Sequence, residues 1–170
     1  MKLEKEVIDV NNLLLAVVED AKFEGAKKKI HIDYQQVLGI SVLRQPDLSH
    51  CAIDNVVRNA LKYSQPEAQV SIAASVTSTT VQITVLDKGL GVKKAKLDLI
   101  IQPFFRGGNT SHAGGHGLGL ALAKQIVEAH CGHIKASNQP TGGLYVVINL
   151  NLMAELSGVN SGWVLLKWSV

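Results

Sequence analysis

The most informative stretch of this chain is Asn55-Val-Val-Arg-Asn59-Ala-Leu-Lys62-Tyr63, which has the pattern of an amphipathic helix with a polar stripe. At about 100° per helical residue, Asn55, Asn59 and Lys62 fall within roughly 60° of one another, while apolar residues cover the other side. A solvated helix face is the alternative interpretation, but two interior Asn residues cost on the order of 1 kcal/mol relative to Ala. Amide oxygens suit Mg²⁺ and a lysine suits phosphate, so the stripe favours a nucleotide site.

A second segment, Asp87-Lys-Gly89-Leu-Gly91, follows the apolar run 81–86. A carboxylate at a strand end can accept a hydrogen bond from the exocyclic amine of adenine. Guanine presents a carbonyl oxygen there and would be repelled, so Asp87 favours ATP over GTP. The glycines allow the backbone to approach a flat base. Taken alone, this segment could equally be an ordinary turn.

Two further segments complete the set, Pro103-Phe-Phe-Arg106 and Gly115-His-Gly-Leu-Gly119-Leu120. The second opens a helix whose free N–H groups and dipole suit phosphate oxygens. It lacks the third glycine of the dinucleotide fingerprint, and no Gly-Lys-Ser/Thr loop is present, so Rossmann and P-loop folds are excluded. The glycine-rich segment 93–116 is long for a connection, as in a functional lid or a disordered loop.

The remaining pattern predicts a two-layer α/β sandwich, with three main helices on one face of a mixed, mostly antiparallel sheet. Helices are expected near 9–21, 46–64 and 118–131, the last ended by a left-handed Gly132. Lys27-Lys-Lys29 is expected to favour a helix C-terminus. The expected strands are 7–8, 30–34, 40–43, 70–76, 81–85, 134–137 and 144–150, with hairpin turns at 77–80 and 140–143. Residues 1–153 form the expected domain, and 154–170 is a tail of unassigned role.

Composition limits the function classes. The chain has 170 residues, 46% of them hydrophobic, and a net charge of +3. Its basic residues are spread out, which argues against nucleic acid as a partner. No apolar run approaches the roughly 20 residues that span a bilayer, and Met1 begins no secretory signal. Cys51 and Cys131, both expected in helical segments, make no disulfide framework, so a reducing cytosol is expected.

Together the four segments resemble the N, G1, F and G2 boxes of the catalytic, ATP-binding domain of bacterial sensor histidine kinases, over roughly 5–152. The resemblance implies a GHKL-type sandwich that holds ATP and Mg²⁺ beneath a mobile lid, with Phe104 and Phe105 anchoring the lid. It implies that Asn59 coordinates Mg²⁺, that Asp87 reads adenine, and that Asp54 and Asn55 are candidate catalytic residues. The nucleotide-binding set that it implies is Asn55, Asn59, Lys62, Tyr63, Asp87, Gly89, Gly91, Val92, Arg106, Gly115, His116, Gly117, Leu118, Gly119 and Leu120.

Departures from the family pattern are few. Leu90 stands where proline is common in the G1 box, Lys88 where a neutral or acidic residue is common, and Cys131 where glycine is frequent. No histidine of the chain stands in the family's phosphoacceptor setting. The chain is therefore interpreted as a monomeric catalytic domain that transfers phosphate to a histidine on a separate dimerisation domain. A response regulator is the expected downstream partner, and the whole protein is expected to be a membrane-bound sensor whose cytosolic part includes this domain.

Three other functions remain open. GHKL ATPases place a glutamate four residues before the Mg²⁺-binding asparagine, where this chain has Asn55, which cannot serve as a base for water. A stand-alone anti-sigma serine kinase shares the fold, and an ATP-binding module without transfer activity is the non-enzymatic alternative. A zinc site at His130, Cys131 and His133, with His112, is also conceivable, although these residues straddle a helix end where side chains diverge.

Overall fold

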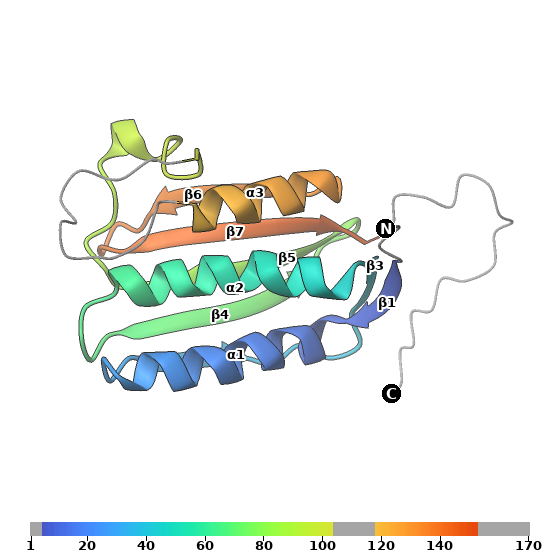
Figure 1. Ribbon diagram of the computed structural model, residues 1–170, viewed down its shortest axis with the longest axis horizontal. Helices are drawn as coiled ribbons and strands as arrows, with labels where there is room; N and C mark the ends of the chain where they lie inside the picture. The colour runs from blue at the N-terminus through green and yellow to red at the C-terminus, as the bar shows by residue number, and fades with distance from the viewer. Residues whose placement is uncertain (1–4, 104–117, 153–170) are drawn as a thin grey trace, which may run out of the picture.

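The computed structural model describes residues 5–103 and 118–152; residues 1–4, 104–117 and 153–170 are outside this description. The described part forms a layered α/β structure (Figure 1). Its elements in chain order are β1 (Glu6–Asp9), α1 (Val10–Ala26), β2 (His31–Gln35), β3 (Ser41–Arg44), α2 (Pro46–Tyr63), β4 (Gln69–Val76), β5 (Thr80–Leu86), the 3₁₀ turn η1 (Lys94–Lys96), α3 (Gly119–Ala129), β6 (His133–Asn138) and β7 (Leu144–Asn151).

Five strands form the main sheet in the order β2-β4-β5-β7-β6. Only the β2–β4 pair is parallel, so the sheet is mixed and mostly antiparallel, as the sequence predicts. Both predicted hairpins are confirmed, with Val76 opposite Val81 and Asn138 opposite Leu144. One arrangement was not predicted: β3 leaves this sheet and pairs antiparallel with β1 in a separate two-stranded ribbon.

The three helices lie side by side over one face of the sheet, with α2 in the centre (Figure 1). Alternate residues of the central strands point into this interface, and the core residues of β5 are Val81, Ile83 and Val85. The apolar faces of the helices cover them, as the 3.6-residue period requires. Burial of this core fixes which face of α2 remains free, and that face carries the polar stripe.

The ends of α1 and α3 are held in different ways, and the end of α3 corrects a prediction. Asp9 caps α1, because its side chain accepts a hydrogen bond of 2.9 Å from the Asn12 N–H. At the end of α3, however, the left-handed residue is Cys131, with φ 57°, and not Gly132. Gly132 is required for another reason, since a Cβ there would lie 2.5 Å from the Asn149 carbonyl oxygen. Cys131 also lies beyond the helix rather than within it, and its side chain is exposed.

Within residues 5–103 and 118–152, no helix combines the length and the apolar character needed to cross a bilayer.

Candidate functional site

Asn55 connects α2 to the start of α3. Its amide donates a hydrogen bond of 2.8 Å to the Cys51 carbonyl, one turn earlier in the helix. A Cβ on Gly119 would lie 3.2 Å from Asn55 Oδ1, closer than an ordinary van der Waals contact, so a larger residue there would require the Asn55 side chain or the first turn of α3 to shift. The glycine thus places the N-terminus of α3 directly against the polar stripe of α2.

Further along the stripe, Asn59 is half-buried, and its side chain makes no hydrogen bond within the described part of the chain. The Lys62 ammonium lies 5.2 Å from the centre of the Tyr63 ring, in a cation–π contact. Tyr63 is exposed at the end of the helix. An amide without a hydrogen-bond partner among the described residues, a lysine and an exposed aromatic ring therefore follow one another along one side of α2.

Asp87 is a buried acid at the end of β5, with only 3% of its surface exposed. Its Oδ1 accepts hydrogen bonds from the Gly89 N–H at 2.8 Å and the Leu144 N–H at 3.1 Å. Burial raises the pKa of the carboxyl above its usual range, and these two N–H donors lower it in part. Because both donors use Oδ1, Oδ2 remains free to accept a hydrogen bond from a ligand.

The turn after Asp87 packs against the end of α2. A Cβ on Gly89 would lie 2.5 Å from the Tyr63 carbonyl oxygen, a distance that no side chain tolerates. Gly91 adopts φ 68°, in the left-handed region that favours glycine. Gly89 therefore brings the turn after Asp87 against the last residue of α2, while Gly91 packs against Asn138 and Gly143. Asp87 thus lies beside the Tyr63 end of the Asn55–Tyr63 stripe.

The end of β6 and the turn that follows it contribute two residues, Asn138 and Gly143, that the sequence did not indicate as part of the site. Gly143 adopts φ 101°, and a Cβ there would lie 1.9 Å from the Asp87 carbonyl oxygen. The Asn138 side-chain amide makes two hydrogen bonds to the backbone of Val92. Its Oδ1 accepts from the Val92 N–H at 2.8 Å, and its Nδ2 donates to the Val92 carbonyl. The Gly142-Gly143 pair was a usable signal, although it was interpreted only as a hairpin turn; Asn138 gave no signal.

Lys28 supports the site from α1. Its ammonium donates hydrogen bonds to the carbonyls of Leu61 and Lys62, at 3.1 and 3.0 Å. These carbonyls belong to the last turn of α2, where a helix leaves acceptors unpaired and a cation is favoured. The lysine run thus does stabilise a helix C-terminus, but the helix is α2 rather than the α1 that precedes the run.

The N-terminus of α3 is open toward the stripe. Leu118 occupies the cap position without a side-chain cap, and the first paired amide is that of Leu122, so the N–H groups of the first turn have no partner in the helix. Leu120 has its side chain in the core, which leaves only its backbone for a ligand. Leu118, by contrast, is exposed.

The side chains of Asp54 and Asn55, adjacent residues of α2, have different partners. It forms an ion pair of 2.9 Å with Arg58 Nε, and Arg58 reaches Glu24 of α1 at 3.7 Å. These contacts turn the Asp54 carboxylate toward α1, whereas Asn55 lies against α3. The structure therefore separates the two candidate catalytic residues and gives Asp54 a partner between helices.

Several predicted site residues lie outside the described residues, namely Phe104, Phe105, Arg106, Gly115, His116 and Gly117, with most of the expected lid. His112 of the conceivable zinc site is outside as well. Among the described residues, no group of three or more His, Cys, Asp or Glu side chains could hold a metal ion. The described site therefore consists of the α2 stripe, the Asp87 turn and the start of α3.

This combination of a three-helix, mixed-sheet sandwich with a polar central helix defines a GHKL-type domain. The chain belongs to the family described as "Histidine kinase-, DNA gyrase B-, and HSP90-like ATPase", whose pattern matches residues 44–154. Among curated proteins, it is 34% identical over 154 residues to the sensor histidine kinase CpxA of Escherichia coli K12, covering 88% of this chain and 33% of that protein. It is 33% identical over 156 residues to the sensor protein kinase WalK of Staphylococcus epidermidis, with 88% and 25% covered.

Solved structures confirm the predicted fold. The mycobacterial sensor histidine kinase MprB superimposes with a TM-score of 0.79 at 24% identity, covering 86% of this chain and 97% of that chain. The catalytic domain of the histidine kinase ThkA gives a TM-score of 0.78 at 20% identity, with 88% and 96% covered. The chain spans about a third or less of the length of the curated relatives named above.

Proposed function

We propose that this domain binds ATP with Mg²⁺ and serves as the catalytic domain of a sensor histidine kinase. The observation that carries the proposal is Asp87, a buried carboxylate with one oxygen fixed by two backbone N–H groups and the other left free. Burying an acid is costly unless a partner uses it. The raised pKa of Asp87 therefore points to a ligand that donates a hydrogen bond at this position.

The adenine end of the ligand fits this carboxylate. Asp87 Oδ2 accepts a hydrogen bond from the exocyclic amine, and Gly89 lets the turn after Asp87 pack against the Tyr63 carbonyl with no side chain from position 89 between them. A guanine would bring a carbonyl oxygen toward Asp87 and leave both acceptors unpaired. We therefore propose that the site selects ATP over GTP.

The phosphate end fits the polar stripe and the start of α3. Asn59 is the free amide that suits Mg²⁺, and Lys62 is the nearby cation for phosphate oxygens. The unpaired N–H groups of the α3 first turn favour anionic oxygens, and the Asn55 side chain lies beside that turn at Gly119. When bound, Mg-ATP supplies the phosphoryl group, while the chain's residues orient its two ends. Arg106 and the glycines at 115–117 are proposed to complete the phosphate site.

The reaction class follows from the residue at position 55. Asn55 donates its amide hydrogen to Cys51 and has no basic atom with which to activate water, so hydrolysis has no base there. A neutral histidine is already nucleophilic and needs no such base. We propose transfer to a histidine on a separate dimerisation domain, with a response regulator downstream, in a cytosolic part of a membrane-bound sensor. Since Asp54 faces α1, we assign it no role in proton transfer.

Calorimetric titration of ATP, GTP and ADP into the domain, each with and without Mg²⁺, tests the binding proposal. Incubation with labelled ATP and a separately made histidine-bearing domain tests the transfer. We expect adenine-selective binding and label on the partner's histidine. Label on a serine partner would identify a serine kinase, and steady phosphate release would identify an ATPase. Absence of nucleotide binding would refute the assignment of the site.

A further inference from the structure

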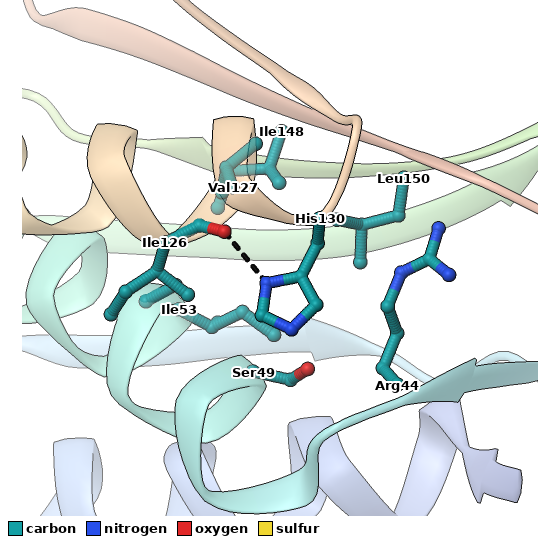
Figure 2. A pocket seen from close by; sticks show the side chains of 9 residues that line it. Arg44, Ser49, Ile53, Ile126, Val127, His130, Ile148 and Leu150 are labelled. Carbon is teal, nitrogen blue, oxygen red and sulfur yellow. Dashed lines mark hydrogen bonds between the residues drawn. The ribbon is translucent and has the colours of Figure 1, made fainter. Parts of the chain in front are cut away.

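The opposite end of the α2–α3 pair holds a small pocket that the proposed function does not use. It lies between the first turns of α2 and the C-terminus of α3, away from the end of α2 and the start of α3 (Figures 1 and 2). Its polar lining residues are Arg44, Ser49 and His130. The remaining lining is apolar and comes from helices α2 and α3 and strand β7.

Arg44 is a buried cation with an unsatisfied donor. Only 5% of its surface is exposed, and burial lowers its pKa from the ordinary value. Two of its guanidinium nitrogens donate to the carbonyls of Leu43 and Asn151, both at 2.7 Å, but its Nε is buried without a partner. Among the described residues no carboxylate pairs with it. A buried charge in this state is costly, so an anion beside it would stabilise the fold.

The other polar groups of the pocket agree with this requirement. Ser49 is a buried residue, and its hydroxyl makes no hydrogen bond to the described residues, so it can donate one. His130 Nδ1 lies 2.7 Å from the Ile126 carbonyl oxygen, which can only accept a hydrogen bond, so this nitrogen carries the proton. The bond holds the imidazole ring in position along one side of the pocket (Figure 2). The open volume is about 10 Å³, enough for roughly one water-sized group. A nucleotide or phosphate ester does not fit, whereas one oxygen of a carboxylate does.

We propose that this pocket binds a single carboxylate, which accepts hydrogen bonds from Arg44 Nε and the Ser49 hydroxyl. Two sources share this chemistry. The carboxylate can come from an acidic side chain of another domain or protein, or from this chain's own acids outside the described residues, which are Glu4 and Glu155. Either occupant would attach a segment at the end of the domain opposite the candidate nucleotide site.

The test uses the Nε–H resonance of Arg44 in ¹⁵N NMR spectra of the full chain. The chain has three arginines, so an Arg44→Lys sample assigns the signal by its loss. Sodium acetate is titrated against sodium chloride at equal ionic strength, in the wild type and in a Glu4→Gln/Glu155→Gln variant. A saturable, acetate-specific shift in the wild type supports an external carboxylate. A shift seen only in the double variant supports the chain's own carboxylate.

Two controls keep the proposal falsifiable. Ser49→Ala is expected to weaken the acetate response about tenfold, because it removes one donor to a charged group. Ser75→Ala, at an exposed position of β4, is expected to leave the response unchanged. Equal shifts in acetate and chloride, or no shift in either protein, would show that water alone fills the pocket and would overturn the proposal. Because the readout is independent of ATP, failure of the nucleotide assignment would leave it unaffected.

Discussion

A charged side chain is buried at each end of the α2–α3 pair, Asp87 at one end and Arg44 at the other, and the two differ in how their polar atoms are paired. At one end, Asp87 follows the central strand β5, and one of its oxygens accepts hydrogen bonds from the N–H groups of Gly89 and of Leu144 at the start of β7. At the other, Arg44 lies at the end of a short outer strand and keeps an unpaired Nε. The Asp87 end is enclosed by glycines whose Cβ positions other backbone atoms occupy. The Arg44 end is enclosed by side chains. We therefore expect substitutions at the glycines of the first end to cost more stability than substitutions of the lining side chains at the second.

The largest expected effect on stability comes from a substitution at one of the glycines that enclose Asp87. Gly143→Ala places a Cβ 1.9 Å from the Asp87 carbonyl oxygen at φ 101°, so the turn must shift. We expect a loss of about 3–5 kcal/mol in the free energy of unfolding, measured by urea denaturation, together with loss of ATP binding. Gly142→Ala is the matched control, because φ is 93° but its nearest neighbour is at 3.6 Å. It should cost about 1–2 kcal/mol. Equal losses would mean that contact with Asp87 is unimportant.

Asp87→Asn separates binding from stability. The change removes a charge-assisted hydrogen bond worth ~1.5–3 kcal/mol, so calorimetry should show ATP affinity reduced about ten- to a hundredfold.

The same residue makes stability depend on pH. Since the pKa of Asp87 is raised in the folded state, the stability that its carboxyl contributes is present below the unfolded pKa and is lost as pH rises through the folded pKa. The variant should therefore unfold at higher temperature than the wild type at neutral pH. Ser49→Ala, at the Arg44 end, should leave ATP affinity within about twofold. Wild-type affinity in Asp87→Asn would contradict the adenine contact.

Asn59→Ala tests the phosphate half of the same end. Removing the free amide should weaken ATP about tenfold in the presence of Mg²⁺ and leave nearly equal affinities with and without the ion. Selection of ATP over GTP should persist, because Asp87 is untouched. Parallel calorimetric titrations with and without Mg²⁺ measure both quantities. An undiminished response to Mg²⁺ would remove Asn59 from the metal site.

Lys28→Met should lower stability by about 1 kcal/mol, since the last carbonyls of α2 lose both hydrogen bonds from Nζ. Lys27→Met is a suitable control, because this exposed neighbour makes no such bond. Thermal unfolding of the two variants gives the comparison. If both lost the same stability, general charge rather than capping would explain the lysine run.

The smallest effect is expected at Asp54. Its ion pair with Arg58 is partly exposed, so Asp54→Asn should change stability by less than about 0.5 kcal/mol. Phosphoryl transfer to a histidine-bearing domain should continue at close to the wild-type rate, because the carboxylate faces α1. A transfer rate reduced a hundredfold with unchanged ATP affinity would restore the catalytic role that the sequence first suggested.

Much of the fold follows from local patterns in the sequence. The alternation at Val81, Ile83 and Val85 identifies a half-buried strand, and the apolar faces of the helices identify one covered side of a sheet. The stripe at 55, 59 and 62 was also predictable, because helical spacing alone puts these residues on one face. Asp87 was predicted as a site residue because it stands between an apolar strand and a glycine turn.

Tertiary structure decided what depends on segments far apart along the chain. Pairing of β3 with β1 rather than with the main sheet, capping of α2 by Lys28 and the approach of Gly143 to Asp87 have no local signature. The unpaired Nε of Arg44 is of the same kind, since burial and missing partners are properties of packing. Sequence periodicity specifies which face of an element is apolar. Only the packed structure specifies which backbone atoms meet there and which charges remain without a partner.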